Sequence, residues 1–213
     1  MSELIKNGIE IIQSEPLLKR AFKWIIENST SNHLPYHNLN HLLTVLKYCD
    51  YIATGEMVYY DNRMELYLAA LFHDVNHSGG KLSDEENIRD AKESYVLFCM
   101  NDAQIYNKTI HDKVASLINC TQYPYHVPFD DLTLHHKIIR DADMMQAFEY
   151  NWIHQTTLGL ATESGKTFKD FIKSQRTFLE NVTFYTPTAL EYKNKRWKQV
   201  MHEFRILETL YVD

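Results

Sequence analysis

Four residues in three widely separated segments could together bind a metal ion: His41, the adjacent pair His73 and Asp74, and Asp143. Each segment has a helical pattern and sets imidazole or carboxylate beside apolar residues, where burial of an unpaired polar group is expensive. If the fold brings the segments together, they form a mixed nitrogen and oxygen site for one or two divalent metals. Such a site activates water for attack on phosphorus, so these residues predict a metal-dependent phosphohydrolase.

The spacing of the histidines limits what each can do. His37 and His41 are four positions apart, so they lie one turn apart on the same face of a helix and could supply a proton donor beside a ligand. His73 and Asp74 are consecutive, and consecutive side chains of a helix point about 100° apart. Both can therefore reach one site only at a helix end, or where two metals share the carboxylate.

The acidic pair Asp141 and Asp143 follows Arg140 in a helical stretch. Two residues separated by two positions cannot both face the same spot on a regular helix. One of them is therefore expected to be a ligand, and the other a cap or an ion-pair partner of Arg140. Taken singly, each histidine could instead be a hydrogen-bonded core residue; the combination with the carboxylates favours a metal site.

The elements that must position these residues are helical almost throughout. The stretch from Arg63 to Asp74 is apolar nearly all round, which predicts a central buried helix. A loop is expected over Asn76–Leu82, and Ser83–Glu86 has the capping-box pattern that opens the next helix. We predict an all-α protein, a compact multi-helix bundle forming one domain over residues 1–213. Further helices are expected at about 38–51, 83–100, 109–122, 131–150, 152–161, 167–182 and 188–212. Two amphipathic stripes precede them: one includes Leu4 and Ile5, and the other begins at Leu17.

Composition excludes several classes of function. The net charge is -6 and no long run of Lys or Arg occurs, which is unfavourable for a nucleic-acid polymer as partner. No apolar run reaches the roughly 18 residues of a membrane-spanning helix, and no signal-peptide pattern follows Met1. Cys49, Cys99 and Cys120 form no close pair, so buried free thiols are expected. We expect a cytoplasmic protein with a small anionic substrate; assembly into a homo-oligomer stays open.

The site segments also resemble a known family. Residues Tyr36–His41, Phe72–Gly79 and Ala142–Asp143 resemble the HD-domain superfamily of metal-dependent phosphohydrolases. The similarity is greatest to its cyclic-nucleotide phosphodiesterase branch, with the motifs H-N-x-x-H, H-D-x-x-H-x-G and A-D. Ser174–Leu179 is similar to the S-Q-x-x-F segment of that branch, so the resemblance covers about residues 36–197. It implies an HD-domain-like helical fold.

The resemblance implies two divalent metals. His41, His73, Asp74 and Asp143 would hold the first, and Asp74 would bridge to a second that is otherwise held largely by water. Zn, Mn or Fe suits the first site, and Mg or Mn the water-rich second.

The resemblance also implies roles around the reacting phosphate. Together with Asp74, two histidines would be catalytic: His37 as the general acid for the leaving oxygen, and His77 in contact with the attacking hydroxide or the phosphate. Gln175 would hydrogen-bond a purine edge and Phe178 would stack on its face. Gln146 stands where the branch has an asparagine, so its contact with the base is open.

Several alternatives stay open. A cyclic purine nucleotide is the first substrate; a phosphatase for nucleoside 5′-monophosphates and a non-catalytic nucleotide-binding, metal-containing module are the rivals. Ser78 stands where the branch has proline, and the catalytic domains of the branch are much longer. An apolar helix would bury Phe178 without any ligand. Glu85 or Glu86 could act near the metals, although the capping box explains Glu86 without catalysis.

Overall fold

The computed structural model describes residues 7–101 and 108–211, so Leu4, Ile5 and Val212 of the predicted helices lie outside the described residues. Within these ranges the structure has helices and no strand, which confirms the all-α prediction. The elements are α1 (Gly8–Ser14), α2 (Pro16–Asn28), α3 (Leu39–Gly55), η1 (Tyr60–Asn62), α4 (Met64–Phe72), α5 (Asp84–Asn101), α6 (Lys108–Asn119), η2 (Phe129–Asp131), α7 (Leu134–Met144), η3 (Met145–Phe148), η4 (Ile153–Leu158), α8 (Gly159–Glu163), α9 (Phe168–Asn181) and α10 (Pro187–Tyr211).

Helix α4 forms the centre of the core. Its residues from Leu66 to Phe72 are all buried, as expected for a helix that is apolar on every side. It packs against α2, α3, α5, α6 and α7. The ring of Phe72, the last residue of α4, lies 5.8 Å from that of Trp24 on α2 and 5.3 Å from that of Phe98 on α5. Burial on all sides fixes the end of α4, where His73 and Asp74 follow.

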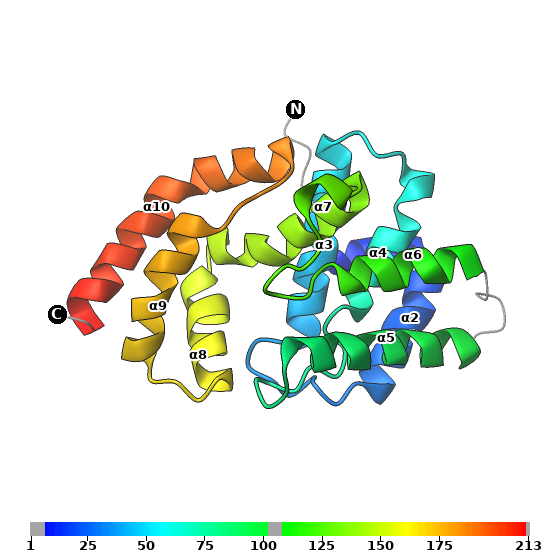
Figure 1. Cartoon of the computed structure of the whole chain (residues 1–213), viewed down its shortest axis with the longest axis horizontal. Coiled ribbons are helices and arrows are strands. Elements are labelled where there is room, and N and C mark those ends of the chain that lie inside the picture. Colours follow the sequence, from blue (N-terminus) through cyan, green and yellow to red (C-terminus); the bar gives the residue numbers. More distant parts are fainter. Residues whose placement is uncertain (1–6, 102–107, 212–213) are drawn as a thin grey trace.

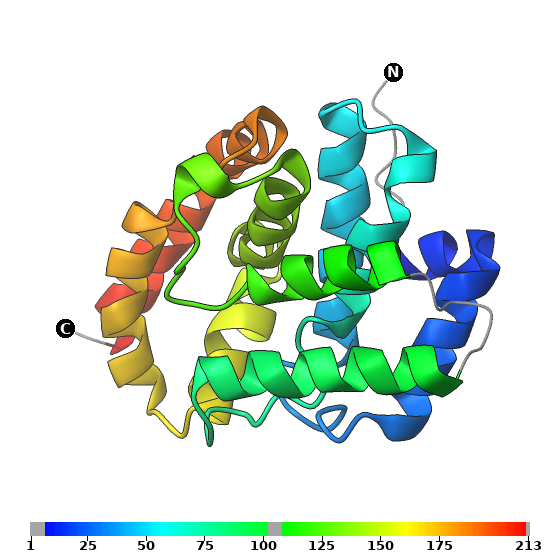
Figure 2. The same ribbon diagram turned by 45° about the vertical axis from the view of Figure 1, so that its right-hand side comes forward.

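The helices form two groups joined through α3 and α7. Helices α8, α9 and α10 lie on one side of the molecule, and α2, α4, α5 and α6 lie on the other (Figures 1 and 2). Helix α7 packs on α3, and η3 continues from α7 to contact α10. Helices α8, α9 and α10 therefore contact the core around α4 through α3, α7 and η3.

Two predicted helices differ in detail from the structure. The stretch expected at 131–150 begins later, because Phe129–Asp131 forms a short 3-10 helix and the Thr133 hydroxyl then caps α7 by accepting from the backbone N–H of His136 (3.3 Å). The stretch expected at 152–161 begins with a π-helix, η4. There the Thr156 hydroxyl donates to the carbonyl oxygen of Gln146 (3.2 Å), which ties η4 to η3.

Three smaller expectations are also tested. Ser83 and Glu86 form the predicted capping box: the Ser83 backbone N–H donates to the Glu86 carboxylate (2.9 Å), and the Glu86 N–H donates to the Ser83 hydroxyl (3.3 Å). The cysteines are free and buried, as predicted. Among the helices in the described ranges, none combines the length and apolar character needed to cross a bilayer.

Candidate metal centre

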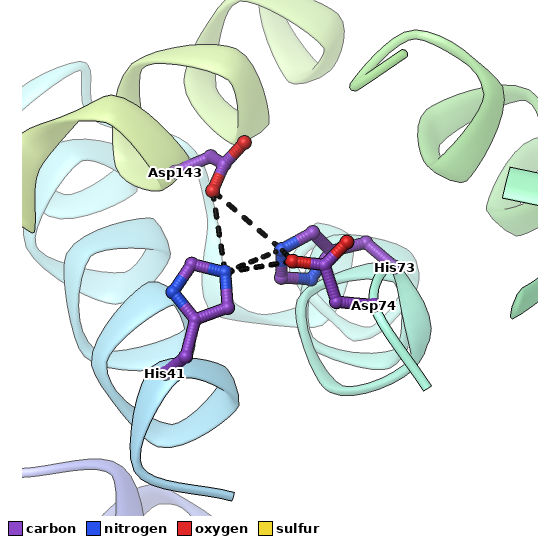
Figure 3. Close-up of side chains that lie close together, drawn as sticks. All are labelled: His41, His73, Asp74 and Asp143. Carbon is purple, nitrogen blue, oxygen red and sulfur yellow. Dashed lines mark hydrogen bonds and ion pairs between the residues drawn. The ribbon is translucent and has the colours of Figure 1, made fainter. Parts of the chain in front are cut away.

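The four predicted ligands converge on one point. His41 comes from the first turn of α3, His73 and Asp74 follow the last turn of α4, and Asp143 comes from the end of α7 (Figure 3). Their donor atoms all lie within 4.8 Å of one another. The Asp74 carboxylate lies 2.9 Å from Nε2 of His41 and 3.1 Å from Nε2 of His73, and Asp143 lies 3.4 and 3.6 Å from the same atoms. His73 is the C-cap of α4, so the helix end lets both consecutive residues reach one site.

Hydrogen bonds on the far side of each ring fix the tautomers of the two imidazoles. Nδ1 of His41 lies 2.6 Å from Oε1 of Gln146, and Nδ1 of His73 lies 3.0 Å from the carbonyl oxygen of Ala70. These oxygens only accept, so each Nδ1 carries a proton and each neutral ring presents the lone pair of Nε2.

The two Nε2 atoms are 3.1 Å apart and face two carboxylates. Two lone pairs and two negative charges at this separation require positive charge between them, which protons or a metal can supply. Two imidazoles and two carboxylates, with each ring oriented from behind by an oxygen acceptor, fit a divalent transition metal.

The protonation equilibria show how strongly the cluster attracts positive charge. Burial lowers the pKa of His41, but hydrogen bonds to Asp143 and Asp74 outweigh it and raise that pKa to about 9. The pKa of His73 rises well above its ordinary value for the same reasons. Burial raises the pKa of Asp143, yet the two imidazoles hold it at about 2. Without a metal, protons on the imidazoles would therefore balance the carboxylates.

A second group of possible ligands adjoins the first. His37, His77 and Glu163 have donor atoms within 4.8 Å of one another. The rings of His37 and His77 are stacked, with centroids 3.6 Å apart, and Nδ1 of His37 is hydrogen-bonded to the Glu163 carboxylate. Nε2 of His37 then lies 3.9 Å from the Asp74 carboxylate. This arrangement can hold a second cation, or it can direct Nε2 of His37 toward the first group.

Glu163 is a site residue that the sequence interpretation missed. Its second carboxylate oxygen accepts from the backbone N–H groups of Tyr36 (3.0 Å) and His37 (3.1 Å) just before α3. A Cβ on Gly159 would lie 3.3 Å from the carbonyl oxygen of Pro35, so glycine permits the close approach of α8 to this segment. One feature of the sequence could have indicated Glu163: it is an acidic residue in the last turn of a helix, where the macrodipole disfavours negative charge.

His77 lies behind the ring of His37. The backbone N–H of Gly79 donates to its Nδ1 (3.1 Å), and the Asn87 amide nitrogen lies 3.1 Å from its Nε2. Gly79 adopts φ +68°, which favours glycine and turns this N–H back toward the ring. Burial lowers the pKa of His77 to about 4, so the ring is neutral at neutral pH. Both ring nitrogens of His77 thus have contacts within the chain, and its contact with hydroxide or phosphate stays a prediction.

A cavity of about 250 Å³, here called the inner cavity, adjoins the four candidate ligands. Asp74, Asp143 and His37 line one part of it, and Gln175 and Phe178 of α9 line another. Gln175 is 7% exposed, and its side-chain amide has no hydrogen-bond partner among the residues that the structure describes. The carboxylates and the two predicted base-contacting residues therefore face one cavity.

Gln146, whose contact with a base was left open, lies behind a candidate ligand. It is buried, and its side-chain oxygen is bonded to Nδ1 of His41, so it orients a candidate ligand from behind instead of facing a base. Asp141 resolves the alternatives for the acidic pair: it accepts from the backbone N–H of Thr186 (2.7 Å) and of Tyr185 (2.9 Å) at the start of α10. Arg140 instead donates to the carbonyl oxygen of Cys120 (2.7 Å).

The acidic stretch at the start of α5 divides between two surfaces. Asp84 lines the inner cavity, and its carboxylate accepts from the backbone N–H of Tyr123 (2.5 Å). Burial raises its pKa, and Asp74 and Asp143 add to that shift. Glu85 and Glu86 line a separate cavity, and Glu86 caps the helix. The carboxylate nearest the candidate centre in this stretch is thus Asp84, which the sequence interpretation did not single out.

Comparison with known proteins identifies one likeness in fold. The crystal structure of a predicted HD superfamily hydrolase from an uncultured Thermotogales bacterium matches 97% of this chain and 99% of its own. The TM-score is 0.63 and the sequence identity is 19%. No protein-family profile matches the chain, and no curated protein matches it. The chain therefore shares its fold with that hydrolase.

Proposed function

We propose that this protein is a metal-dependent phosphohydrolase that cleaves a phosphoester bond of a small nucleotide. One observation carries the proposal: two imidazole lone pairs and two carboxylates, from three separate helices, are directed at one point. The shared fold with a predicted HD superfamily hydrolase supports it. The resemblance of the motifs to cyclic-nucleotide phosphodiesterases makes a cyclic purine nucleotide the first substrate to examine.

The four residues of the first group would hold the metal, and His37, His77 and Glu163 are available for a second. A bound divalent cation lowers the pKa of water and neutralises phosphate charge. Asp74 and Asp143 are the ligands that line the inner cavity, so a substrate phosphate there lies beside the centre. Both imidazole ligands stay behind them, each only 1% exposed.

His37 would supply the proton to the departing ester oxygen. Its Nδ1 is hydrogen-bonded to Glu163, which orients the ring so that Nε2 lies 3.9 Å from the Asp74 carboxylate. Burial acts to raise the pKa of Glu163, but the bonds from His37 and from the backbone outweigh it and lower that pKa. Glu163 is therefore ionised at neutral pH and accepts the hydrogen bond that orients His37.

Gln175 and Phe178 would bind the base. The Gln175 amide has no other partner among the described residues, and Phe178 offers its ring to the same cavity. A phosphatase for nucleoside 5′-monophosphates would use the same centre with a smaller ligand. A non-catalytic module would bind nucleotide and metal without turnover.

A matrix of metals and substrates tests the proposal. Metal-free protein is refilled with Zn, Mn, Fe or Mg, and each form is offered cyclic nucleotides, 5′-monophosphates and a chromogenic phosphodiester. We expect at least one metal to give turnover of a diester, with loss of both metal and turnover in Asp143→Ala. Nucleotide binding without turnover for every metal would identify the binding module, and absence of stoichiometric metal binding would reject the centre itself.

A further inference from the structure

We propose that a second cavity beside the inner one binds the second nucleoside of a phosphodiester, so that the substrate carries an aromatic base on each side of its phosphate. This inference rests on the proposed phosphodiester hydrolysis. The second cavity, here called the outer cavity, has a volume of about 620 Å³ and is lined by residues of α9 and by loops on either side of it. It shares Tyr123, Met144 and Phe178 with the inner cavity, so the two cavities are adjacent.

The position of the shared residues connects the outer cavity to the reacting centre. Met144 follows Asp143 directly, and Phe178 follows Gln175 by one turn of α9. A ligand whose phosphate lies beside Asp143 can therefore extend in two directions, toward Gln175 or past Met144 into the outer cavity. The inner cavity alone, at about 250 Å³, is smaller than the roughly 300–1,000 Å³ usual for ligand pockets. A ligand larger than the inner cavity would therefore have to occupy both cavities.

The walls of the outer cavity suit a nucleoside. Tyr125 and Tyr185 contribute aromatic rings in an edge-to-face arrangement with centroids 6.2 Å apart, and an aromatic wall of this kind suits a planar base. Thr177 and Asn181 add a hydroxyl and an amide, which can hydrogen-bond a base edge or a sugar. The guanidinium of Arg140 lies 4.1 Å from the Tyr125 ring centroid and is itself bonded to a backbone carbonyl, so this wall is preformed.

A second, independent observation also points to a ligand. The hydroxyl of Tyr125 is buried and has no hydrogen-bond partner among the residues described by the structure. A buried polar group without a partner costs free energy that a bound acceptor would recover. Tyr125 lines the outer cavity, so a ribose or base oxygen that reaches this hydroxyl from the cavity would accept from it. The aromatic wall, the polar rim and the unpartnered donor thus indicate the same class of ligand.

The corresponding reaction is hydrolysis of a dinucleoside monophosphate or a longer linear analogue. An oxygen of water forms the new bond to phosphorus, and the bond from phosphorus to one ester oxygen breaks. That oxygen leaves with a proton, so the products are one nucleoside and one nucleoside monophosphate. No oxidant or further reactant is needed.

The test compares two diesters that share the first nucleoside: adenylyl-(3′,5′)-adenosine and the methyl ester of adenosine 3′-phosphate. We expect the metal-loaded enzyme to have a kcat/KM at least about tenfold higher for the dinucleoside. Thr177→Trp fills the outer cavity from an exposed helical position and should reduce that ratio to near one. Thr209→Trp, at an exposed position of α10, is the matched control and should leave the ratio unchanged.

Tyr125→Phe removes only the unpartnered hydroxyl. We expect kcat/KM for the dinucleoside to fall about tenfold while the value for the methyl ester and the Tm do not decrease. Equal ratios in the wild type, Thr177→Trp and Tyr125→Phe, with the methyl ester still hydrolysed, would overturn the outer cavity as a subsite and leave the hydrolase proposal intact.

Binding separates the remaining cases. The Kd of a non-hydrolysable phosphorothioate dinucleoside is measured by calorimetry for the same variants, each loaded with metal. If no diester is hydrolysed, weaker binding in Thr177→Trp but not in Thr209→Trp upholds the subsite, and only the catalytic proposal fails. Identical binding in both variants rejects the subsite, whatever the turnover.

Discussion

The orientation of single side chains decides the chemistry of the candidate centre. His41 and His73 each donate from Nδ1 to an oxygen behind the ring, so both Nε2 lone pairs face Asp74 and Asp143. A histidine without such a partner could turn its N–H toward the cluster and close it to a metal. The side-chain oxygen of Gln146 is therefore as important to the arrangement as the ligands themselves.

Metal affinity should depend steeply on pH. The pKa of His41 is raised to about 9 in the metal-free cluster, so below pH 9 a metal must displace a proton to bind. We expect the association constant of Zn or Mn to rise about tenfold or more per pH unit between pH 7 and pH 9, since at least one proton is released. Calorimetry in buffers of different ionisation enthalpy measures that release. A constant affinity with no proton transferred to the buffer would contradict the raised pKa of His41.

Replacing Glu163 should separate its two possible roles. Glu163→Gln keeps the shape of the side chain but removes the negative charge beside Nδ1 of His37. If the pair acts as proton donor, kcat falls by about 10²–10⁴ and metal content is unchanged. His37→Ala should show a similar loss with the metal retained. Loss of one bound ion in Glu163→Gln, by elemental analysis, would instead make Glu163 a ligand of a second metal.

At the scale of elements, helix ends bring the functional groups together. His73 is the C-cap of α4, His37 precedes the N-cap of α3, and Glu163 ends α8. His41 lies in the first turn of α3. Backbone groups at helix ends lack partners within the helix, so capping contacts tie these ends to one another. Glu163 does this by accepting from the backbone before α3, and Asp141 does it at the start of α10. The same contacts that complete the helices therefore hold the site.

The start of α5 allows a test that separates capping from catalysis. Ser83→Ala removes the N-cap hydroxyl and should lower the free energy of unfolding by about 1 kcal/mol, measured by urea titration. Glu86→Gln retains an acceptor at the third helical position, so both stability and turnover should stay close to the wild type. A large fall in kcat for Glu86→Gln, with an unchanged unfolding curve, would show that this carboxylate takes part in the reaction.

At the scale of the whole molecule, the candidate centre lies where α3 and α7, the helices between the two groups, pack against each other and against α4. The carboxylates of Asp141 and Asp143, both on α7, make different contacts. Asp141 binds the backbone at the start of α10, whereas Asp143 faces the cluster. One helix thus contributes both a structural contact and a candidate ligand, on different faces.

Stability measurements should distinguish these two carboxylates. A metal that binds only the folded state, at one hundred times its Kd, adds about 2.7 kcal/mol to the free energy of unfolding. We expect this gain in the wild type and in Asp141→Ala, and its loss in Asp143→Ala. Without metal, Asp141→Ala should lose about 1–3 kcal/mol, because the buried N–H of Thr186 is left without an acceptor. An equal metal-induced shift of Tm in all three proteins would contradict the assignment of Asp143.

The sequence by itself determined the helical class and the four candidate ligands. Periodicity in apolar residues is local, and the end of an apolar helix is visible in the chain, so α4 and the position of His73 after it were predictable. The choice of Asp143 over Asp141 came from the family resemblance, because local spacing shows only that the two cannot share a face.

Only the tertiary structure decided what surrounds those ligands. Glu163 meets His37 across 126 positions, and Gln146 meets His41 across 105. Such contacts depend on how α8 and η3 pack against α3, which no local pattern encodes. The adjacency of the inner and outer cavities has the same origin, since the shared residues Tyr123, Met144 and Phe178 come from three separate segments. Helical periodicity fixes which face of a segment is apolar; packing of distant segments fixes which polar groups meet.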